Sequence, residues 1–328
     1  MDDYNRMTYT SPPTDISTDD LVLPFQIESS DIHGRLVTLG HGVDGVLGSH
    51  DYPEPVAKLL GELVVISAAA AGAFKFRGML SLHTSSDGPV PMMIAEYRAP
   101  GGDDPRVAPA ALRGYARFDA EKVAALAQSD LDQTPVAALL GSGHLAITID
   151  PGAGGERYQG VTALEGSTLV ECMHGYFRQS EQFDAALRVD VGRTGGDGTP
   201  WRASGVMVQR LPKKGAPFLD RENEDWFHAL ALIGSMDRAA LLDGSEPQKT
   251  VLKKIFPNEP VRAYRPVRVD SQCRCSRDKV DTMLHSFSAE DRADMLEDGK
   301  VTVTCEFCAS TYVFEADQLE IPPRTSAQ

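Results

Sequence analysis

Cys273-Arg-Cys275, followed after twenty-nine intervening residues by Cys305-Glu-Phe-Cys308, decides the fold of the last part of this chain. These two pairs contain four of its five cysteines. Zinc is commonly held by four thiolates at about 2.3 Å, and each close pair supplies two ligands from one local turn. The spacing therefore predicts a small zinc domain over residues 271–320, with Cys273, Cys275, Cys305 and Cys308 as the ligands of one Zn²⁺.

The residues around the cysteines predict two helices and a hairpin. Residues 276–284 have a helical pattern, and Ser288-Ala-Glu-Asp291 resembles a capping box that starts a second helix, closed by Gly299. Residues 301–304 and 311–314 have the alternation of strands, which would place the second cysteine pair at a hairpin tip, as in a zinc knuckle. The apolar residues available for a core are few: Val280, Leu284, Phe287, Leu296, Tyr312 and Phe314.

Because this core is small, the zinc ion would supply much of the domain's folding free energy, and losing the metal would unfold the domain. A zinc-bound thiolate is also a nucleophile that oxidants attack. A bridge between Cys273 and Cys275 would close a small, strained ring of the labile kind. The residues alone leave two possibilities open, a purely structural zinc site and a reversible switch.

Composition limits the partners and the compartment. The 328 residues include 47 acidic and 32 basic side chains, for a net charge of -15, which repels phosphate backbones and argues against nucleic-acid binding. We find no basic-then-apolar leader and no apolar run of the roughly 18 residues that span a bilayer. Five cysteines are too few for a secreted disulfide scaffold. We therefore expect a soluble, cytoplasmic protein without a membrane partner.

The longer first part of the chain predicts an α+β core domain over residues 21–220, with mixed sheets and packed helices. The main signals are strands at 21–27, 35–40 and 201–211, a helix at 53–74, a hairpin formed by 74–83 and 90–97, and a helix that starts after Gly166, capped by Ser167, with Leu169, Met173, Tyr176, Phe177 and Ser180 on one face.

Three further segments complete the predicted organisation. Residues 221–270 contain short helix-like patches interrupted by prolines, so we expect a helical linker of low intrinsic stability. Residues 1–20 and 321–328 are expected to be flexible tails.

The remaining titratable residues do not predict an enzyme. Cys172 is expected to be a buried small side chain, and His174, two residues away, would lie on another helix face. His285 is not needed as a ligand beside four thiolates. Glu165, Glu171 and Glu181 are expected to cap or solvate helix ends. No nucleophile elbow, His-Glu-x-x-His or nucleotide-binding motif is present, so we predict no catalytic residues.

Several short strings, taken together, resemble the redox-regulated heat shock protein 33 family, the 33 kDa chaperonins. They lie in family order along residues 21–320: Phe76-Arg-Gly78, Asp87-Gly-Pro-Val90, Leu112-Arg-Gly-Tyr-Ala-Arg117, Tyr158-Gln-Gly160, Leu164-Glu-Gly166, Tyr176-Phe-Arg-Gln-Ser-Glu-Gln182, Gln209-Arg-Leu-Pro212 and Cys273-Arg-Cys-Ser276. The N-terminal extension, the Gly- and Asp-rich loop at 100–105 and Cys172 are not required by this pattern.

The resemblance implies an ATP-independent holdase that is inactive while reduced and zinc-bound. Oxidation would form Cys273-Cys275 and Cys305-Cys308 disulfides, with the second pair reacting first. Zinc would then leave, the zinc domain and linker would unfold, and an apolar surface would bind unfolding client proteins, usually as a homodimer. The alternatives are a structural zinc-ribbon interaction module, a nucleic-acid-binding zinc ribbon and a thiol oxidoreductase. The acidic spacer between the cysteine pairs already disfavours nucleic acid.

Overall fold

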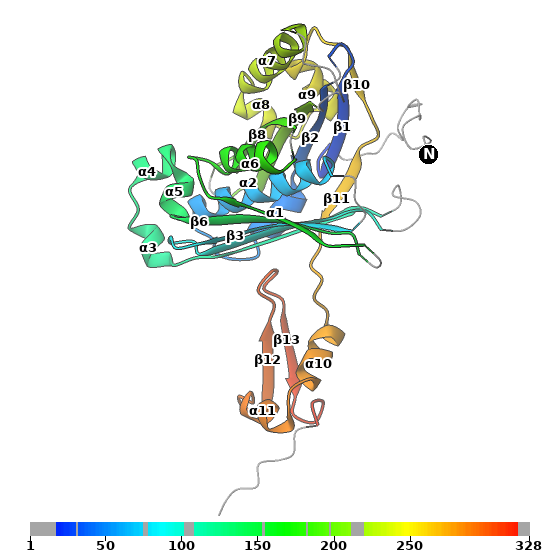
Figure 1. Cartoon of the computed structure of the whole chain (residues 1–328). Helices are drawn as coiled ribbons and strands as arrows, with labels where there is room; N and C mark the ends of the chain where they lie inside the picture. Colours follow the sequence, from blue (N-terminus) through cyan, green and yellow to red (C-terminus); the bar gives the residue numbers. More distant parts are fainter. Residues whose placement is uncertain are drawn as a thin grey trace, which may run out of the picture. The chain divides into compact units, whose positions relative to one another are not determined.

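The structure is a computed structural model that describes residues 18–30, 32–74, 78–101, 108–152, 155–181, 183–196, 198–210 and 220–320. The chain divides into two compact units, the first ending at Ser271 and the second beginning at Gln272. We call them the large unit and the small unit and describe each by itself (Figure 1). Most of the two expected tails and of the loop at 100–105 lies outside the described residues.

The large unit is built on one mixed sheet. Within the described residues the sheet has eleven strands, in the order β7-β6-β3-β4-β5-β11-β1-β2-β9-β8, with β10 paired to β1. All neighbours are antiparallel except β11 and β5, which run parallel. The strands are β1 (Leu21–Ile27), β2 (Ile32–Leu39), β3 (Met79–Ser86), β4 (Met92–Arg98), β5 (Ala110–Arg117), β6 (Gly143–Asp150), β7 (Tyr158–Ala163), β8 (Asp184–Arg193), β9 (Trp201–Arg210), β10 (Val261–Ala263) and β11 (Val267–Ser271). The α+β fold with a mixed sheet is confirmed.

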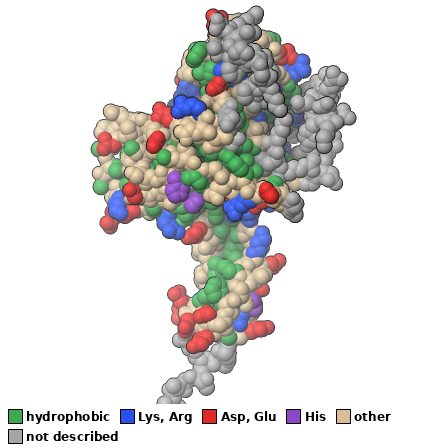
Figure 2. Space-filling model, viewed as in Figure 1, with side chains coloured by type: hydrophobic (Ala, Val, Ile, Leu, Met, Phe, Trp, Pro, Cys, Tyr) green, Lys and Arg blue, Asp and Glu red, His purple; other side chains and the backbone are tan. Residues whose placement is uncertain are grey.

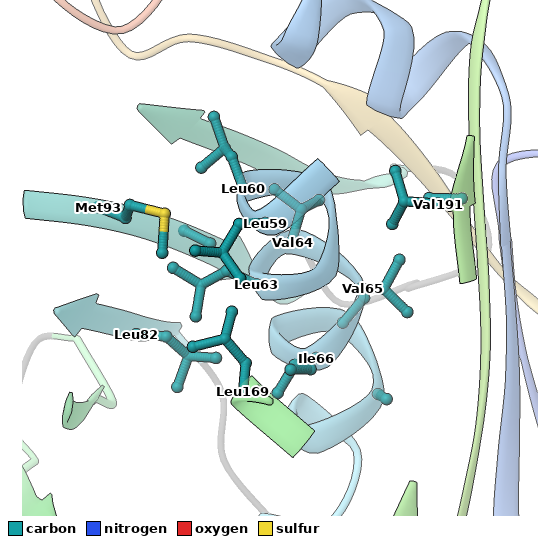
Figure 3. Packing of buried hydrophobic residues seen from close by; sticks show 14 of the residues in the cluster. Leu59, Leu60, Leu63, Val64, Val65, Ile66, Leu82, Met93, Leu169 and Val191 are labelled. Atoms are coloured by element: carbon teal, nitrogen blue, oxygen red, sulfur yellow. The ribbon is translucent and has the colours of Figure 1, made fainter. Parts of the chain in front are cut away.

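Helix α2 (Glu54–Ala71) forms the centre of the main core, as its sequence predicts. It is apolar almost all round, as expected of a helix buried on several sides. In Figure 3 its residues Leu59, Leu63 and Val64 lie among Leu82 and Met93 of the sheet. The shorter helices of this part are α1 (His41–Leu47), α3 (Ala120–Ala124), α4 (Gln128–Gln133) and α5 (Pro135–Leu139). No helix in the described part of the chain is both long and apolar enough to cross a bilayer.

Helix α6 (Leu169–Tyr176) differs from its prediction at both ends. Thr168, in extended conformation, is the N-cap and accepts a hydrogen bond from the backbone of Glu171, so the helix begins one residue later than a Ser167 cap requires. The chain continues from α6 into a π-helical turn, η1 (Phe177–Glu181), whose wider winding changes which side chains face the core. Ser180 is consequently exposed, although the sequence places it on the buried face.

The segment between the large core and the cysteines folds as α7 (Asp220–Gly234), α8 (Arg238–Leu242) and α9 (Gln248–Ile255), followed by β10 and β11. Figure 1 shows the three helices beside β1, β2, β8 and β9. Their apolar residues form a second core with one face of these strands, composed mainly of Phe25, Ile32, Leu36, Val206, Val208, Trp226, Ile233, Val251, Leu252, Ile255 and Phe256.

This half of the sheet is therefore covered on both faces. Val37 and Met207 pack in the main core with α2, while their sequence neighbours Leu36 and Val206 pack against the helical segment. Successive side chains of a strand point to opposite faces, so α2 and the α7–α9 segment lie on opposite sides of β2 and β9. Removing the segment would expose one apolar sheet face.

The small unit contains α10 (Arg277–His285), α11 (Ala289–Asp294) and the hairpin β12 (Lys300–Thr304) and β13 (Thr311–Glu315). The predicted capping box of Ser288 and Asp291 is confirmed. Ser276, predicted as the first residue of a helix, is instead the N-cap of α10.

Two details of the small unit correct the prediction. Helix α11 already ends at Asp294, and Gly299, with φ of 81°, lies instead in the turn that leads into β12. Phe287 is 41% exposed and outside the core, which consists of Val280, Leu284, Val301, Phe314 and Leu319. The core is as small as the sequence predicts.

Candidate metal centre

The four cysteines come from two backbone turns of the small unit. Cys273 and Cys275 lie just before α10, whose N-cap is Ser276. Cys305 and Cys308 lie between β12 and β13, at the tip of the hairpin. There the backbone of Cys305 bonds to both Ser310 and Ala309, closing the turn on the side of the hairpin ladder.

The sulfur atoms have the separations that a tetrahedral metal requires. Cys273 Sγ lies 3.7 Å from Cys305 Sγ, and Cys275 Sγ lies 3.4 Å from Cys308 Sγ. All four lie within 4.8 Å of one another. Zinc at about 2.3 Å from each sulfur implies sulfur separations of about 3.8 Å. All four cysteines are free and half-buried, so the arrangement fits one thiophilic metal ion with a closed four-sulfur shell.

Two hydroxyl groups contact the sulfurs. The Tyr312 hydroxyl donates a hydrogen bond to Cys275 Sγ at 3.1 Å. Cys308 Sγ lies 3.3 Å from Ser310 Oγ. Sequence reasoning treated Tyr312 as a core residue and missed both contacts. Their positions, two and four residues after Cys308, were the available signal.

The metal-free thiols differ in acidity. Burial raises the pKa of Cys275 to about 12, although the hydrogen bond from Tyr312 acts in the opposite direction. Burial also raises the pKa of Cys305. For Cys308, burial likewise opposes ionisation, but hydrogen bonding with Ser310, Cys275 and Cys273 together outweighs burial and lowers the pKa to about 7. The hydrogen bond to Cys275 is the main reason that the pKa of Tyr312 rises to about 12. A metal that takes all four thiolates must therefore displace protons from them.

The surface of the small unit is acidic. In Figure 2, red side chains predominate among the charged groups on its visible face. Between residues 272 and 320, the basic residues Arg274, Arg277, Lys279, Arg292 and Lys300 are outnumbered by Asp278, Asp281, Glu290, Asp291, Asp294, Glu297, Asp298, Glu306, Glu315, Asp317 and Glu320. This charge balance is unsuited to a phosphate backbone.

The other candidate residues are not members of the sulfur cluster. Cys172 is buried in α6, its thiol donates to the Glu165 carbonyl oxygen, and burial raises its pKa to about 11, as expected of an inert small side chain. His174 accepts a hydrogen bond from the Leu187 backbone and forms no pair with Cys172. The His285 Nδ1 lies near the Asp281 carbonyl oxygen, not among the sulfurs.

Fold and site together define a class: an α+β protein with a mixed sheet, followed by a small unit whose four cysteines are placed to hold a metal ion. The family model described as "Hsp33 protein" matches residues 20–315, and the chain therefore belongs to the Hsp33 family.

Curated relatives and a solved structure agree with this assignment. The chain is 40% identical over 308 residues to a 33 kDa chaperonin of Caulobacter vibrioides, covering 93% of this chain and 98% of the relative. It is 33% identical over 305 residues to a 33 kDa chaperonin of Pseudomonas fluorescens, covering 92% and 93%. The crystal structure of the 33 kDa chaperonin from Thermotoga maritima matches with a TM-score of 0.75 at 19% identity, covering 92% of this chain and 96% of that chain, and supports the fold.

Proposed function

We propose that this protein is a redox-regulated, ATP-independent holdase chaperone whose four-cysteine centre is its switch. The observation that carries the proposal is that the sulfur atoms of Cys273, Cys275, Cys305 and Cys308 all lie within 4.8 Å of one another. They lie in a unit with a very small core. In the reduced state these residues would hold one Zn²⁺ per chain. The ion would cross-link the loop before α10 to the β12–β13 hairpin and so stabilise the unit.

Oxidation would convert the ligands into two disulfides, Cys273-Cys275 and Cys305-Cys308. With hydrogen peroxide, each pair of thiolates gives up two electrons and forms one S–S bond, while the O–O bond breaks to give two hydroxide ions. The new bonds use the electron pairs that bound the metal, so each disulfide removes two ligands. The small unit would then lose the cross-link on which its fold depends.

Unfolding would extend into the α7–α9 segment. Strand β11, which follows this segment, ends at Ser271, two residues before Cys273. Disorder of the small unit would therefore start in residues directly adjacent in sequence to a strand of the large sheet. Helices α8 and α9 are too short to be stable without tertiary contacts. Their low intrinsic stability supports the proposal that residues 221–270 form a metastable linker.

When the α7–α9 segment separates from the sheet, apolar side chains would be exposed on both the segment and the sheet face. The segment would expose Trp226, Ile233 and Ile255, and the sheet would expose Leu36 and Val208. Burial of each such side chain contributes about 1.5–3 kcal/mol. This free energy would favour binding of the exposed apolar side chains of unfolding clients. We infer that this face binds clients without ATP and without catalysis, and that the oxidised form is a homodimer.

The same proposal places the protein in the cytoplasm, where thiols stay reduced until oxidants accumulate, with neither nucleic acid nor membrane as a partner. The acidic surface of the small unit supports the exclusion of nucleic acid as a partner.

The test follows zinc release and suppression of a thermally aggregating client in parallel, before and after peroxide at raised temperature. We expect both to rise together and both to reverse when a thiol reductant and zinc are restored. Zinc release without chaperone activity would contradict the holdase function and leave a structural metal unit. Retention of zinc under peroxide would contradict the switch itself.

A further inference from the structure

The phenol of Tyr312 is placed to control one of the four sulfurs. Its hydroxyl lies 3.1 Å from Cys275 Sγ. We propose that Tyr312 is a positioning residue that slows oxidation of Cys275, and with it formation of the Cys273-Cys275 disulfide. This inference rests on the proposed redox switch and assigns part of its regulation to a residue that is not a metal ligand.

The backbone and the core hold the phenol in place. Tyr312 lies in β13 and is paired with Val303 of β12 in the hairpin ladder. Its ring is half-buried and packs against the small core that contains Val280 and Phe314. An aromatic side chain has only two torsions, and here packing and the ladder limit both, so its hydroxyl is directed at the sulfur at little entropic cost.

The hydrogen bond lowers the reactivity of the sulfur. A thiolate has no proton to give, so the phenol must donate and draws electron density from it. A donor that favours the charged sulfur lowers its basicity, and the nucleophilicity of a thiolate falls with its basicity, with a Brønsted coefficient of about 0.4–0.5. In the metal-bound centre all four sulfurs are already thiolates. The loss of nucleophilicity is therefore not offset by a larger ionised fraction.

The two pairs contact different hydroxyl groups. Cys308 faces the Ser310 hydroxyl at 3.3 Å, a longer contact to an aliphatic hydroxyl. A phenol is the more acidic group and the stronger donor. The phenol acts on the Cys273-Cys275 pair alone, so Tyr312 slows that pair and shifts the ratio of the two oxidation rates toward the Cys305-Cys308 pair.

The test uses the zinc-loaded full-length chain and Tyr312→Phe, which keeps the ring and removes the hydroxyl. After exposure to hydrogen peroxide, free thiols are alkylated at timed intervals and each disulfide is quantified by mass spectrometry. We expect Cys273-Cys275 to form about three- to tenfold faster in the variant, with the Cys305-Cys308 rate changed by less than about twofold. Ser310→Ala should give the reverse selectivity with a smaller effect.

Tyr264→Phe is the matched control, because Tyr264 also donates its phenol proton, to Gln26 Oε1 at 2.7 Å, but in the large unit. Its two disulfide rates should equal those of the wild type. Replacement of Tyr312 by 3-fluorotyrosine preserves shape and strengthens the donor, so it should slow Cys273-Cys275 formation. This second variant keeps the test decisive if Tyr312→Phe loads zinc poorly.

The outcomes separate this inference from the proposed function. A wild-type chain that forms neither disulfide and keeps its zinc under peroxide would contradict the switch. A wild-type chain that forms both, with an unchanged ratio of the two rates in Tyr312→Phe, would overturn only the role of Tyr312. Equal acceleration of both disulfides would show that the variant merely loosens the small unit, and would also overturn it.

Discussion

Each of the four sulfurs of the proposed metal centre can be tested separately as a ligand. Replacing Cys305 by serine leaves three thiolates and a hydroxyl that is a much poorer ligand for a thiophilic metal. We expect Cys305→Ser to weaken zinc binding by more than the roughly 10- to 100-fold that changes outside the ligand shell cause. Zinc content by elemental analysis and competition with a chromophoric chelator measure it.

The matched control is Cys172→Ala, which removes the one cysteine buried in the large unit. It should keep one zinc per chain. Equal zinc affinity in wild type and Cys305→Ser would contradict the ligand set.

Glu62, in the middle of α2, gives the large unit a pH dependence. Burial and repulsion by Asp190 raise its pKa to about 7, although attraction to Arg238 acts in the opposite direction. Since the folded-state pKa lies above the unfolded value, the fold favours the protonated carboxyl. The free energy of unfolding should fall by about 3 kcal/mol between about pH 4.5 and pH 7 through this group, and stay lower above pH 7.

Glu62→Gln should therefore stabilise the protein at pH 8 and have little effect near pH 4.5, as measured by urea unfolding at both values. Glu54→Gln, in the first turn of the same helix, is the control. Hydrogen bonding to Lys58 lowers the pKa of Glu54, so removing this carboxylate should not raise the free energy of unfolding at pH 8. A Glu62→Gln variant no more stable than the wild type at pH 8 would refute this assignment.

At the scale of elements, one side chain anchors the start of α9. The buried Gln248 Nε2 donates to Thr38 Oγ1 at 2.9 Å and to the Leu21 carbonyl oxygen at 3.1 Å, joining α9 to β1 and β2. Gln248→Leu would leave these buried acceptors without their donor, at a cost of about 1–3 kcal/mol. We expect faster hydrogen exchange in α8 and α9, and chaperone activation at a lower temperature.

Lys253→Ala, on the exposed side of the same helix, should change neither property. If Gln248→Leu exchanges like the wild type throughout α8 and α9, the anchoring role is wrong.

Elements decided by local sequence could be predicted, and those decided by distant pairing could not. The apolar run of α2, the Ser288 and Asp291 capping box, and the β12–β13 hairpin each follow from a few neighbouring residues. By contrast, β11 inserts between β1 and β5, its partners lying far away in the chain, and no local pattern encodes that choice. In the same way, the cysteine spacing predicts the ligand set, whereas the contact of Tyr312 with Cys275 requires the folded hairpin.

At the scale of the whole molecule, the two units should respond differently to removal of zinc. The small unit has a core of five buried apolar residues, whereas the large unit has two extensive cores. Metal binding contributes about 10–16 kcal/mol to folding in zinc-finger peptides, far more than so small a core can replace. A chelator should abolish the tertiary structure of the small unit while α2 and its sheet stay folded.

Two-dimensional NMR spectra recorded before and after chelation measure this difference, and added zinc should restore the lost resonances. Loss of the α2 and sheet resonances together with those of the small unit, or no loss from the small unit, would contradict the independence of the main core.

The central claim is that one metal centre keeps both the small unit and the α7–α9 segment folded. Hydrogen exchange with mass spectrometry, on the zinc-loaded chain before and after peroxide at raised temperature, tests it most directly. The account predicts that residues 273–320 and 220–255 lose protection together when the two disulfides form, while residues 54–71 keep theirs. Unchanged protection of residues 220–255 in a chain that has lost its zinc would contradict it.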